Sequence, residues 1–274
     1  MFEVKSVSKV FGTVTAVKDL SFMAEKPEVI GIIGRSGAGK STFLRVMNRM
    51  TTATDGQLIV DGVDVLKLRG KAKLEWQRQC AMIFQQFNLV PRLDVLTNVI
   101  LGQLNKQSVL RSSLMFFTQQ ERHDALRLLD RFGVSQVALQ RAETLSGGQQ
   151  QRVAICRAMM QKPSYILADE PIASLDPLNA RLVMEALHGI NRDENITVIC
   201  NLHTLDTARH YCDRVIGMRA GEKVFDDVPE ALTDDMAREI YGAEAEEAFE
   251  GAITSTTLDL PTMQAPVSVS QAAV

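Results

Sequence analysis

The stretch Gly34-Arg35-Ser36-Gly37-Ala38-Gly39-Lys40-Ser41-Thr42 decides how the rest of the chain is interpreted. It fits the pattern G-x-x-x-x-G-K-[ST], which is typical of loops that bind the phosphates of a nucleoside triphosphate. An apolar run at 29–33 precedes it and predicts a buried strand, and apolar residues at helical spacing follow it. The loop therefore stands between a strand end and a helix start, where phosphate binding requires it.

The chemistry of this loop follows from its residue types. Glycines let the backbone wrap closely round phosphate oxygens with N–H groups pointing inward, and the helix start adds partial positive charge. Lys40 supplies a full charge for the β- and γ-phosphates, and the Ser41 hydroxyl can bind Mg²⁺. The alternative is a chance glycine-rich turn, which the strand and helix on either side disfavour. We expect the whole stretch to bind nucleotide: Gly34, Arg35, Ser36, Gly37, Ala38, Gly39, Lys40, Ser41 and Thr42.

Composition excludes several classes of protein. The 274 residues are 46% hydrophobic and 23% charged, as in an ordinary globular protein. A net charge of −3 argues against a dedicated nucleic-acid binder, so no nucleic-acid partner is expected. The apolar runs are too short to span a membrane, and Met1 leads straight into a strand-like segment. We therefore expect a cytosolic protein without a signal peptide. The four cysteines are expected to be buried, reduced thiols.

Adjacent carboxylates end another predicted strand. Tyr165–Ala168 is apolar, and Asp169-Glu170 follows it directly. Carboxylates are costly at the end of a buried strand unless they have a function. Beside a phosphate loop, Asp169 would anchor Mg²⁺, and Glu170 would orient and deprotonate the attacking water. The alternative is a carboxylate pair that only caps a helix.

Two further polar residues follow predicted strands. Gln85 comes after the apolar run 80–84, and His203 comes shortly after the run 196–200. Ligand contacts in an α/β sheet lie at the carboxyl ends of strands. Gln85 could therefore coordinate Mg²⁺ and His203 could hydrogen-bond the γ-phosphate, or both could be plain loop residues.

The order of predicted elements favours an α/β fold. Residues 2–22 predict an antiparallel strand pair, and Asp61-Gly62 predicts a hairpin. Strand signals stop and helices dominate over about 93–162, and we expect the helical subdomain over about 86–162. We expect a P-loop NTPase core with an antiparallel β subdomain and an inserted α-helical subdomain, together forming one domain over 1–242. The segment 243–274 is acidic and then low in complexity, which predicts a disordered tail.

The helical region contains the motif Leu-Ser-Gly-Gly-Gln at 145–149. Ser146 and the two glycines indicate a helix N-cap that could be a second anion site, although a lone cap is usually only structural. Phe11 lies ahead of the phosphate loop, where it could stack on a purine or be a core residue. Taken alone, Phe11 favours the core interpretation.

These segments, in this order, resemble the ATP-binding subunit of ABC transporters over about residues 2–242. The motif at 145–149, with the phosphate loop and Asp169-Glu170, carries the resemblance. The resemblance implies that Phe11 stacks on adenine, where Tyr is commoner, and that His203 is the switch histidine. It implies ATP and Mg²⁺ as ligands. The remaining implied nucleotide contacts are Gln85, Ser146, Gly147, Gly148, Gln149 and Asp176, with Ser41, Gln85 and Asp169 on the metal.

The family resemblance also implies partners. Two copies are expected to pack head to tail with ATP between them, so that the signature of one faces the γ-phosphate held by Lys40 of the other. Closure of this dimer would be coupled to transport, and residues 85–96 would receive a transmembrane permease. A solute-binding protein would act indirectly, and the chain would be peripheral to the cytoplasmic face of the inner membrane.

A finer resemblance points to importers of phosphonate-type anions. It is carried by the insert 111–117 and by the segments 168–177, 201–203 and 211–216. Importers of polar amino acids share the general pattern but usually lack the insert. We therefore expect a phosphonate or phosphite importer ATPase. An importer of another small solute remains the alternative.

Two other classes are disfavoured. A soluble ABC ATPase usually carries two cassettes or a long coiled-coil insertion, and this chain has neither. A non-catalytic regulatory cassette is at odds with intact Lys40, Asp169, Glu170 and His203.

Overall fold

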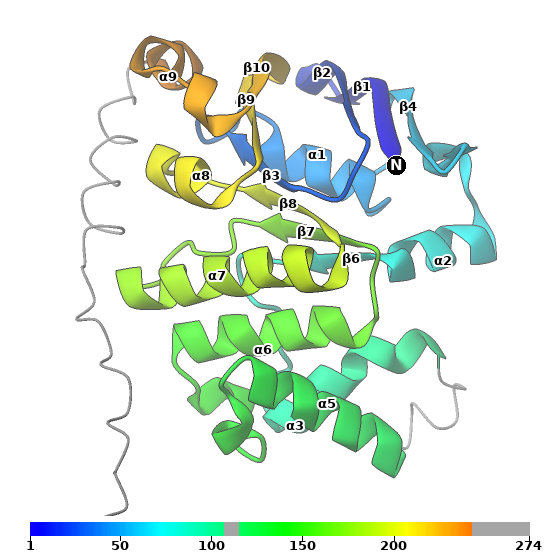
Figure 1. Cartoon of the computed structure of the whole chain (residues 1–274). Helices are drawn as coiled ribbons and strands as arrows, with labels where there is room; N and C mark the ends of the chain where they lie inside the picture. The colour runs from blue at the N-terminus through cyan, green and yellow to red at the C-terminus, as the bar shows by residue number, and fades with distance from the viewer. Residues whose placement is uncertain (107–114, 243–274) are drawn as a thin grey trace, which may run out of the picture.

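The computed structural model describes residues 1–106 and 115–242 (Figure 1). Its strands form a four-stranded antiparallel sheet, in the order β2-β1-β4-β5, and a six-stranded sheet, in the order β10-β9-β3-β8-β7-β6. In the second sheet β3, β6, β7, β8 and β9 run parallel, and only β10 is antiparallel to its neighbour. The α/β fold class predicted from the sequence is confirmed.

The strands are β1 (Phe2–Phe11), β2 (Val14–Ala24), β3 (Val29–Ile33), β4 (Asp55–Val60), β5 (Val63–Asp64), β6 (Cys80–Ile83), β7 (Tyr165–Asp169), β8 (Thr197–Asn201), β9 (Arg214–Arg219) and β10 (Glu222–Asp227). The α-helices are α1 (Lys40–Met47), α2 (Gly70–Gln79), α3 (Val95–Ile100), α5 (Gln119–Arg131), α6 (Gly147–Met160), α7 (Pro177–Glu194), α8 (Leu205–Tyr211) and α9 (Asp234–Tyr241). Short 3₁₀ turns lie at Val65–Lys67, Leu101–Lys106, Ser135–Val137, Ala142–Thr144 and Pro229–Ala231.

The six-stranded sheet separates two hydrophobic cores. Alternate side chains of a strand point to opposite faces, so Ile30 and Ile32 of β3 face one core while Val29 and Ile33 face the other. The first core lies between this sheet, α1 and the antiparallel sheet. The second contains α3, α5, α6 and α7. Strands β3 and β8 are buried along their whole length, as the apolar runs in the sequence predict.

The helical stretch forms a layer of its own beyond α7 (Figure 1). Helix α6 packs against α3 and α5 on one side and against α7 on the other. Of the insert 111–117, residues 111–114 lie outside the described part of the chain. The boundaries 1–242 and 86–162 stay predictions.

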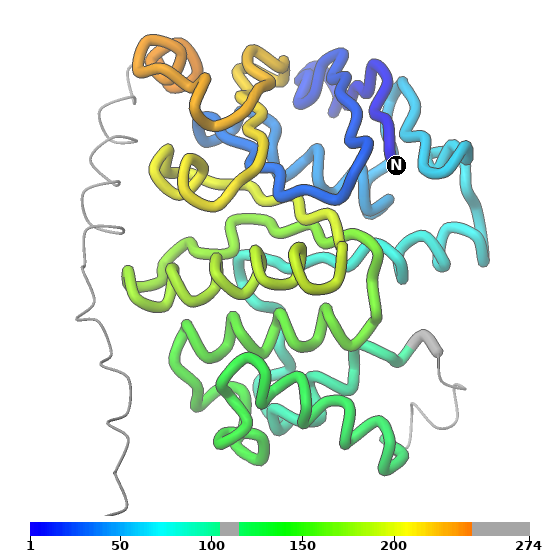
Figure 2. Tube along the Cα trace, viewed as in Figure 1, coloured from blue at the N-terminus to red at the C-terminus, as the bar shows by residue number. Residues whose placement is uncertain are grey.

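The β1–β2 pair and the β9–β10 pair, from opposite ends of the sequence, lie side by side (Figure 2). The backbone N–H of Lys18 in β2 donates to the carbonyl of Gly221, between β9 and β10, at 2.8 Å. The predicted helix at 230–241 is a 3₁₀ turn followed by α9. The Thr233 hydroxyl begins α9 by accepting the Met236 N–H at 3.3 Å. The predicted tail 243–274 lies outside the described residues.

All four cysteines are free and buried, as expected. Burial raises the pKa of the Cys80 and Cys200 thiols to about 12, so both remain protonated and unreactive at neutral pH.

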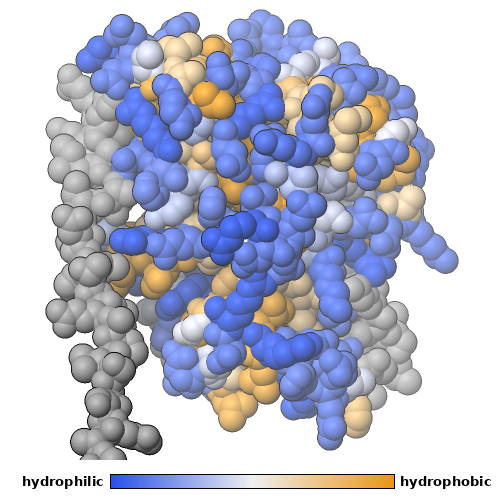
Figure 3. All heavy atoms as spheres, in the orientation of Figure 1, coloured by the Kyte–Doolittle hydropathy of each residue, from blue (hydrophilic) through white to orange (hydrophobic). Residues whose placement is uncertain are grey.

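The described surface is mixed in character. Hydrophilic residues cover most of the face in Figure 3, and hydrophobic residues show in smaller groups, one of them over the helical layer. Within 1–106 and 115–242, the helices are all too short or too polar to cross a lipid bilayer.

Candidate functional site

Four neighbouring parallel strands bring the predicted site residues to one edge of the sheet. Strands β6, β7, β8 and β3 are adjacent in that order, and their carboxyl ends meet at this edge. Gln85 follows β6, Asp169 ends β7, His203 follows β8 and the phosphate loop follows β3. Because the sheet is parallel, four segments far apart in the sequence form one site.

The phosphate loop depends on glycine at particular positions. Gly34 has φ 145° and Gly39 has φ 102°, and both values are in the region that favours glycine. A Cβ on Gly34 would lie 2.2 Å from the Met218 carbonyl oxygen, and one on Gly39 would lie 2.1 Å from that of Ala16. The loop is therefore fixed against β9 and β2, and neither glycine can be replaced without moving backbone.

The Lys40 side chain turns back into this loop. Its ammonium donates to the Gly34 carbonyl at 2.5 Å and to the Arg35 carbonyl at 3.1 Å. Lys40 is 4% exposed, so its charge is held at the loop rather than in solvent. This arrangement concentrates positive charge at the phosphate loop.

The Asp169 carboxylate is held by two buried neighbours. Its Oδ1 accepts from the Ser41 hydroxyl and from the Asn201 amide, each at 2.7 Å. Asp169 and Asn201 are direct register partners of β7 and β8, which explains their contact. Arg45 approaches the other oxygen, Oδ2, to 3.9 Å. The structure thus joins two predicted metal ligands, Ser41 and Asp169, in one cluster.

Asn201 was not predicted as a site residue. It is fully buried, and its Oδ1 has no hydrogen-bond partner among the described residues. A polar residue at the end of a buried strand, two positions before His203, was the available signal. Oxygen atoms of a hydroxyl, a carboxylate and an amide are the donors that Mg²⁺ prefers, so this cluster fits a magnesium ion.

Glu170 and His203 contact each other. The distance from His203 Nε2 to Glu170 Oε1 is 2.7 Å, with the imidazole 44% exposed and the carboxylate 17% exposed. Glu170 has φ 52°, an unusual conformation for a residue other than glycine, and such positions cluster at functional sites. The two predicted catalytic side chains therefore lie together and reach the surface at the strand edge.

The other two predicted contacts of the nucleotide are exposed. Gln85 is exposed two positions after the end of β6. Phe11 ends β1 with half of its surface exposed, and the Lys9 ammonium lies 4.5 Å from its ring centroid. An exposed ring of this kind is available to stack, and it contradicts the interpretation of Phe11 as a core residue.

The signature segment begins α6. The Ser146 hydroxyl accepts the Gln149 N–H at 3.4 Å, and the Gln149 side-chain oxygen accepts the Ser146 N–H at 3.0 Å. This reciprocal capping box fixes the start of the helix, as the sequence predicts. Ser146 and Gly147 are exposed, and Gly148 is buried.

Gly148 is buried because α7 begins beside it. A Cβ on Gly148 would lie 2.1 Å from the Asn179 side-chain oxygen. Asn179 in turn donates its amide to the Asp176 carboxylate at 2.6 Å, and its N–H bonds the same side chain at 3.0 Å. The signature and the predicted aspartate contact are thus neighbours within one chain, which no spacing in the sequence indicated.

Arg157 is another residue that the sequence did not single out. It lies on α6, and its guanidinium donates to the carbonyl of Phe87 at 2.7 Å and to that of Asn88 at 2.5 Å. Phe87 and Asn88 have φ 58° and 51°. Arg157 therefore fixes the unusual backbone that follows Gln85 to the signature helix.

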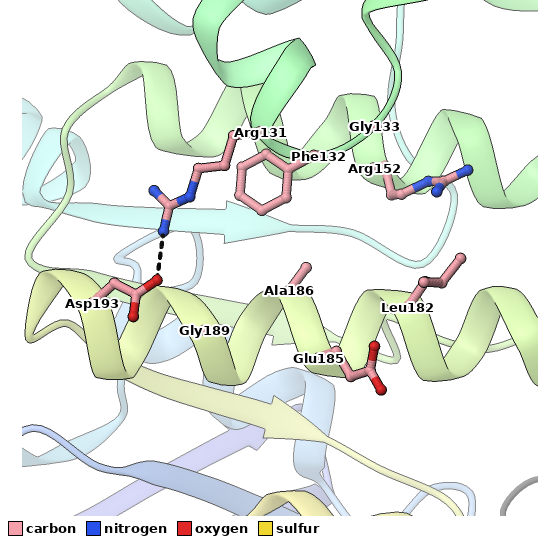
Figure 4. A pocket seen from close by; sticks show the side chains of 9 residues that line it. All are labelled: Arg131, Phe132, Gly133, Arg152, Leu182, Glu185, Ala186, Gly189 and Asp193. Carbon is pink, nitrogen blue, oxygen red and sulfur yellow. Dashed lines mark ion pairs between the residues drawn. The ribbon is translucent and has the colours of Figure 1, made fainter. Parts of the chain in front are cut away.

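A separate pocket lies where the helical layer meets α7 (Figure 4). Arg131 and Arg152 line one side, and Glu185 and Asp193 line the other. Arg131 pairs with Asp193 at 3.5 Å. The predicted site residues are absent from the lining of this pocket, so it is distinct from the site at the strand ends.

The fold and the site define a phosphate-loop nucleotide-binding protein. The family described as ABC transporter matches residues 17–173. The phosphonates import ATP-binding protein PhnC of Rhizobium johnstonii is 57% identical over 260 residues, covering 94% of this chain and 93% of the relative. The protein of the same name from Ruegeria pomeroyi is 57% identical over 259 residues, covering 94% of each. The chain belongs to the ABC transporter family.

Solved structures agree with this assignment. One is a dimeric ATP-binding cassette in a post-hydrolysis state with ADP and Pi bound. It matches with a TM-score of 0.74 and 31% identity, covering 84% of this chain and 99% of that chain. An ATP-binding cassette of an ABC transporter in its ADP conformation matches with a TM-score of 0.76 and 25% identity, covering 92% and 98%.

Proposed function

We propose that the chain is the ATP-hydrolysing, energy-coupling subunit of an ABC importer for phosphonates or phosphite-like anions. The observation that carries the hydrolytic part is the Glu170–His203 pair beside the phosphate loop, at the ends of adjacent strands. The solute class is supported by the names of relatives that match nearly the whole chain.

The roles of the site residues follow from their chemistry. Lys40 and the loop N–H groups bind the β- and γ-phosphates, while the exposed Phe11 ring stacks on adenine. Ser41, Gln85 and Asp169 are the residues that would hold Mg²⁺, which when bound offsets phosphate charge.

Glu170 accepts a proton from the attacking water. His203, whose Nε2 lies 2.7 Å from Glu170 Oε1, orients that carboxylate and contacts the γ-phosphate.

A second copy of the chain would complete each site. Ser146, Gly147, Gly148 and Gln149 begin α6 with backbone N–H groups at its positive end, and Ser146 and Gly147 are exposed. Packed head to tail, these groups face the γ-phosphate on the partner subunit, and Asp176 lies beside them through Asn179. ATP would then close the dimer and hydrolysis would reopen it, because the γ-phosphate contacts exist only before cleavage.

The remaining partners are membrane proteins. Residues 85–96 and the adjoining helices would receive the permease, which places the chain on the cytoplasmic face of the inner membrane as a peripheral subunit. A solute-binding protein would act through the permease. The ATP-binding domain would span 1–242.

A complementation experiment tests the two-chain site. Lys40→Ala and Gly148→Ala are each expected to abolish most ATP hydrolysis when purified alone. In a head-to-tail dimer of the two variants, one pocket has an intact loop from one chain and an intact signature from the other. Mixing the variants is therefore expected to restore phosphate release. A mixture as inactive as its parts, with dimers present, would refute the shared pocket.

The solute is tested by growth. A strain that lacks the gene is expected to fail on a phosphonate as sole phosphorus source and to grow on phosphate. Growth should return with the wild-type gene and not with Glu170→Gln. Normal growth of the deletion strain on phosphonates and phosphite would assign the subunit to another solute.

A further inference from the structure

Tyr241, the last residue of α9, lies against the site from a side that the sequence did not indicate. It is 3% exposed, and its hydroxyl donates to the backbone carbonyl of His203 at 3.0 Å. The backbone amide of Gly34 lies beside the phenol, where it lowers the pKa of Tyr241. A single buried hydroxyl therefore bonds the residue that carries the candidate phosphate-contacting imidazole and lies beside the first residue of the phosphate loop.

Gly34 and His203, the two residues beside the Tyr241 hydroxyl, are each linked directly to a side chain with a proposed role in hydrolysis. The carbonyl of Gly34 accepts the Lys40 ammonium at 2.5 Å. The side chain of His203 contacts Glu170 at 2.7 Å. Tyr241 therefore acts on the backbone of Gly34 and His203, and not directly on the side chains of Lys40 and Glu170.

The packing of helix α9 fixes the position of Tyr241. Ala237 and Ile240 are fully or almost fully buried, and a Cβ on Gly217 in β9 would lie 2.6 Å from the Ile240 side chain. The Arg209 guanidinium donates to the Leu232 carbonyl at 2.6 Å and so ties α8 to the turn before α9. The helix is thus packed into the core and cannot follow a movement of one loop alone.

The phenol keeps its proton at physiological pH. Burial raises the pKa of Tyr241 well above its usual range, and the Gly34 backbone amide offsets only part of that effect. Tyr241 can therefore donate to the His203 carbonyl, while its oxygen keeps a lone pair on which the Gly34 amide can act.

We infer that Tyr241 is a positioning residue for ATP hydrolysis: its hydroxyl sets the position of the His203 backbone relative to the phosphate loop. This inference rests on the proposed function. Without the hydroxyl, the loop and His203 are free to separate, so the imidazole is less often in place when the γ-phosphate is cleaved. Nucleotide binding through Lys40 and the loop amides should change little.

The experiment compares two tyrosines in the full-length chain. Tyr241→Phe keeps the buried ring and removes only the hydroxyl. Tyr211→Phe is the matched control, because that ring is half-buried beside His210 and lies outside the site. Phosphate release is measured over a range of ATP concentrations, and ADP affinity and stoichiometry are measured by titration, at a temperature well below each melting point.

Tyr241→Phe is expected to lower kcat about tenfold, the change that about 1.4 kcal/mol of lost transition-state stabilisation produces. KM and the ADP titration should stay within about twofold, and Tyr211→Phe should match wild type. A second measurement tests the position of the loop without ATP hydrolysis. Amide hydrogen exchange at Gly34 should be faster in Tyr241→Phe than in Tyr211→Phe.

Three results would overturn the inference. These are an unchanged kcat in Tyr241→Phe, an equal loss in Tyr211→Phe, or a loss explained wholly by fewer nucleotide-binding chains. If wild type releases no phosphate, the proposed function fails instead. Exchange at Gly34 then still decides whether Tyr241 holds the loop.

Discussion

The phosphate loop and the signature segment both open a helix, α1 and α6, yet the chain builds their surroundings differently. The loop faces side chains from its own chain: Lys40 is buried against loop carbonyls, and Ser41 meets Asp169 from another strand. The signature has local capping bonds and exposed Ser146 and Gly147. The two lie on opposite faces of the six-stranded sheet. The first region is held by contacts within one chain, and the second presents its helix end outward.

This difference predicts which function a substitution in each region should impair. Changes around the loop should alter what one chain does by itself. Changes at the signature should spare nucleotide binding and impair only what two chains do together. The following experiments would break or sharpen that distinction.

The largest effect is expected from Glu170→Gln. The amide keeps the shape of the side chain and cannot accept the proton of water, so ATP hydrolysis should fall by about 10² to 10⁴-fold while ATP still binds. Steady-state phosphate release and ATP titration measure the two effects. Hydrolysis at the wild-type rate would show that another group is the base.

Gly148→Ala should come next. The added Cβ meets the Asn179 side chain at 2.1 Å, so the start of α6 or of α7 must shift. A shift of about 1 Å can cost up to about a hundredfold in rate, whereas ATP affinity of the single chain should be unchanged.

Gly189→Ala is the control for Gly148→Ala, because it also lies in a helix and its Cβ would meet nothing within 4 Å. It should leave hydrolysis intact and stabilise the fold by about 0.5–1 kcal/mol. If Gly148→Ala weakens ATP binding by the single chain, the two regions are not separate.

Asn201→Ala should have a smaller effect, confined to the loop side. It removes one of the two hydrogen bonds on Asp169 Oδ1, a loss of about 1.5–3 kcal/mol for a bond to a charged group. We expect hydrolysis to need more Mg²⁺. Asn191→Ala is the control, since its amide donates to the Ile196 carbonyl at 2.8 Å, away from the site. Equal Mg²⁺ requirements in both variants would remove Asn201 from the metal site.

The smallest change is in stability, from Ser146→Ala. Loss of the capping box should cost about 1 kcal/mol of unfolding free energy, seen in denaturant melts. Thr118→Ala removes the equivalent box at the start of α5 and should cost about as much. Only Ser146→Ala should also reduce hydrolysis. Equal activities would limit Ser146 to a structural cap.

Much of the fold could be predicted because its strands are short apolar runs bounded by turn residues. The runs at 29–33, 165–168 and 196–200 became β3, β7 and β8 almost without adjustment. The fold class was confirmed, and the roles of the site residues stay predictions.

What the sequence could not provide is the order of strands in the sheet, because hydrophobic periodicity is local. The contacts of Asn201 with Asp169 and of Glu170 with His203 depend on β8 lying between β3 and β7. The contacts of Arg157 and Tyr241 depend on how whole helices pack. Neither residue stands in a motif, and each contacts backbone atoms, which carry no residue-specific signal.

The pair of hydrogen bonds from the Arg157 guanidinium to Phe87 and Asn88 has a mechanical consequence. One planar group bonded to two successive carbonyls fixes both the place and the direction of residues 87 and 88 relative to α6. A tilt of that helix must therefore rotate the two peptide units with it, and a force applied to them must turn the helix. Residues 85–96, proposed to receive a permease, and the signature at the start of α6, proposed to reach a second ATP, should therefore move together as one rigid unit.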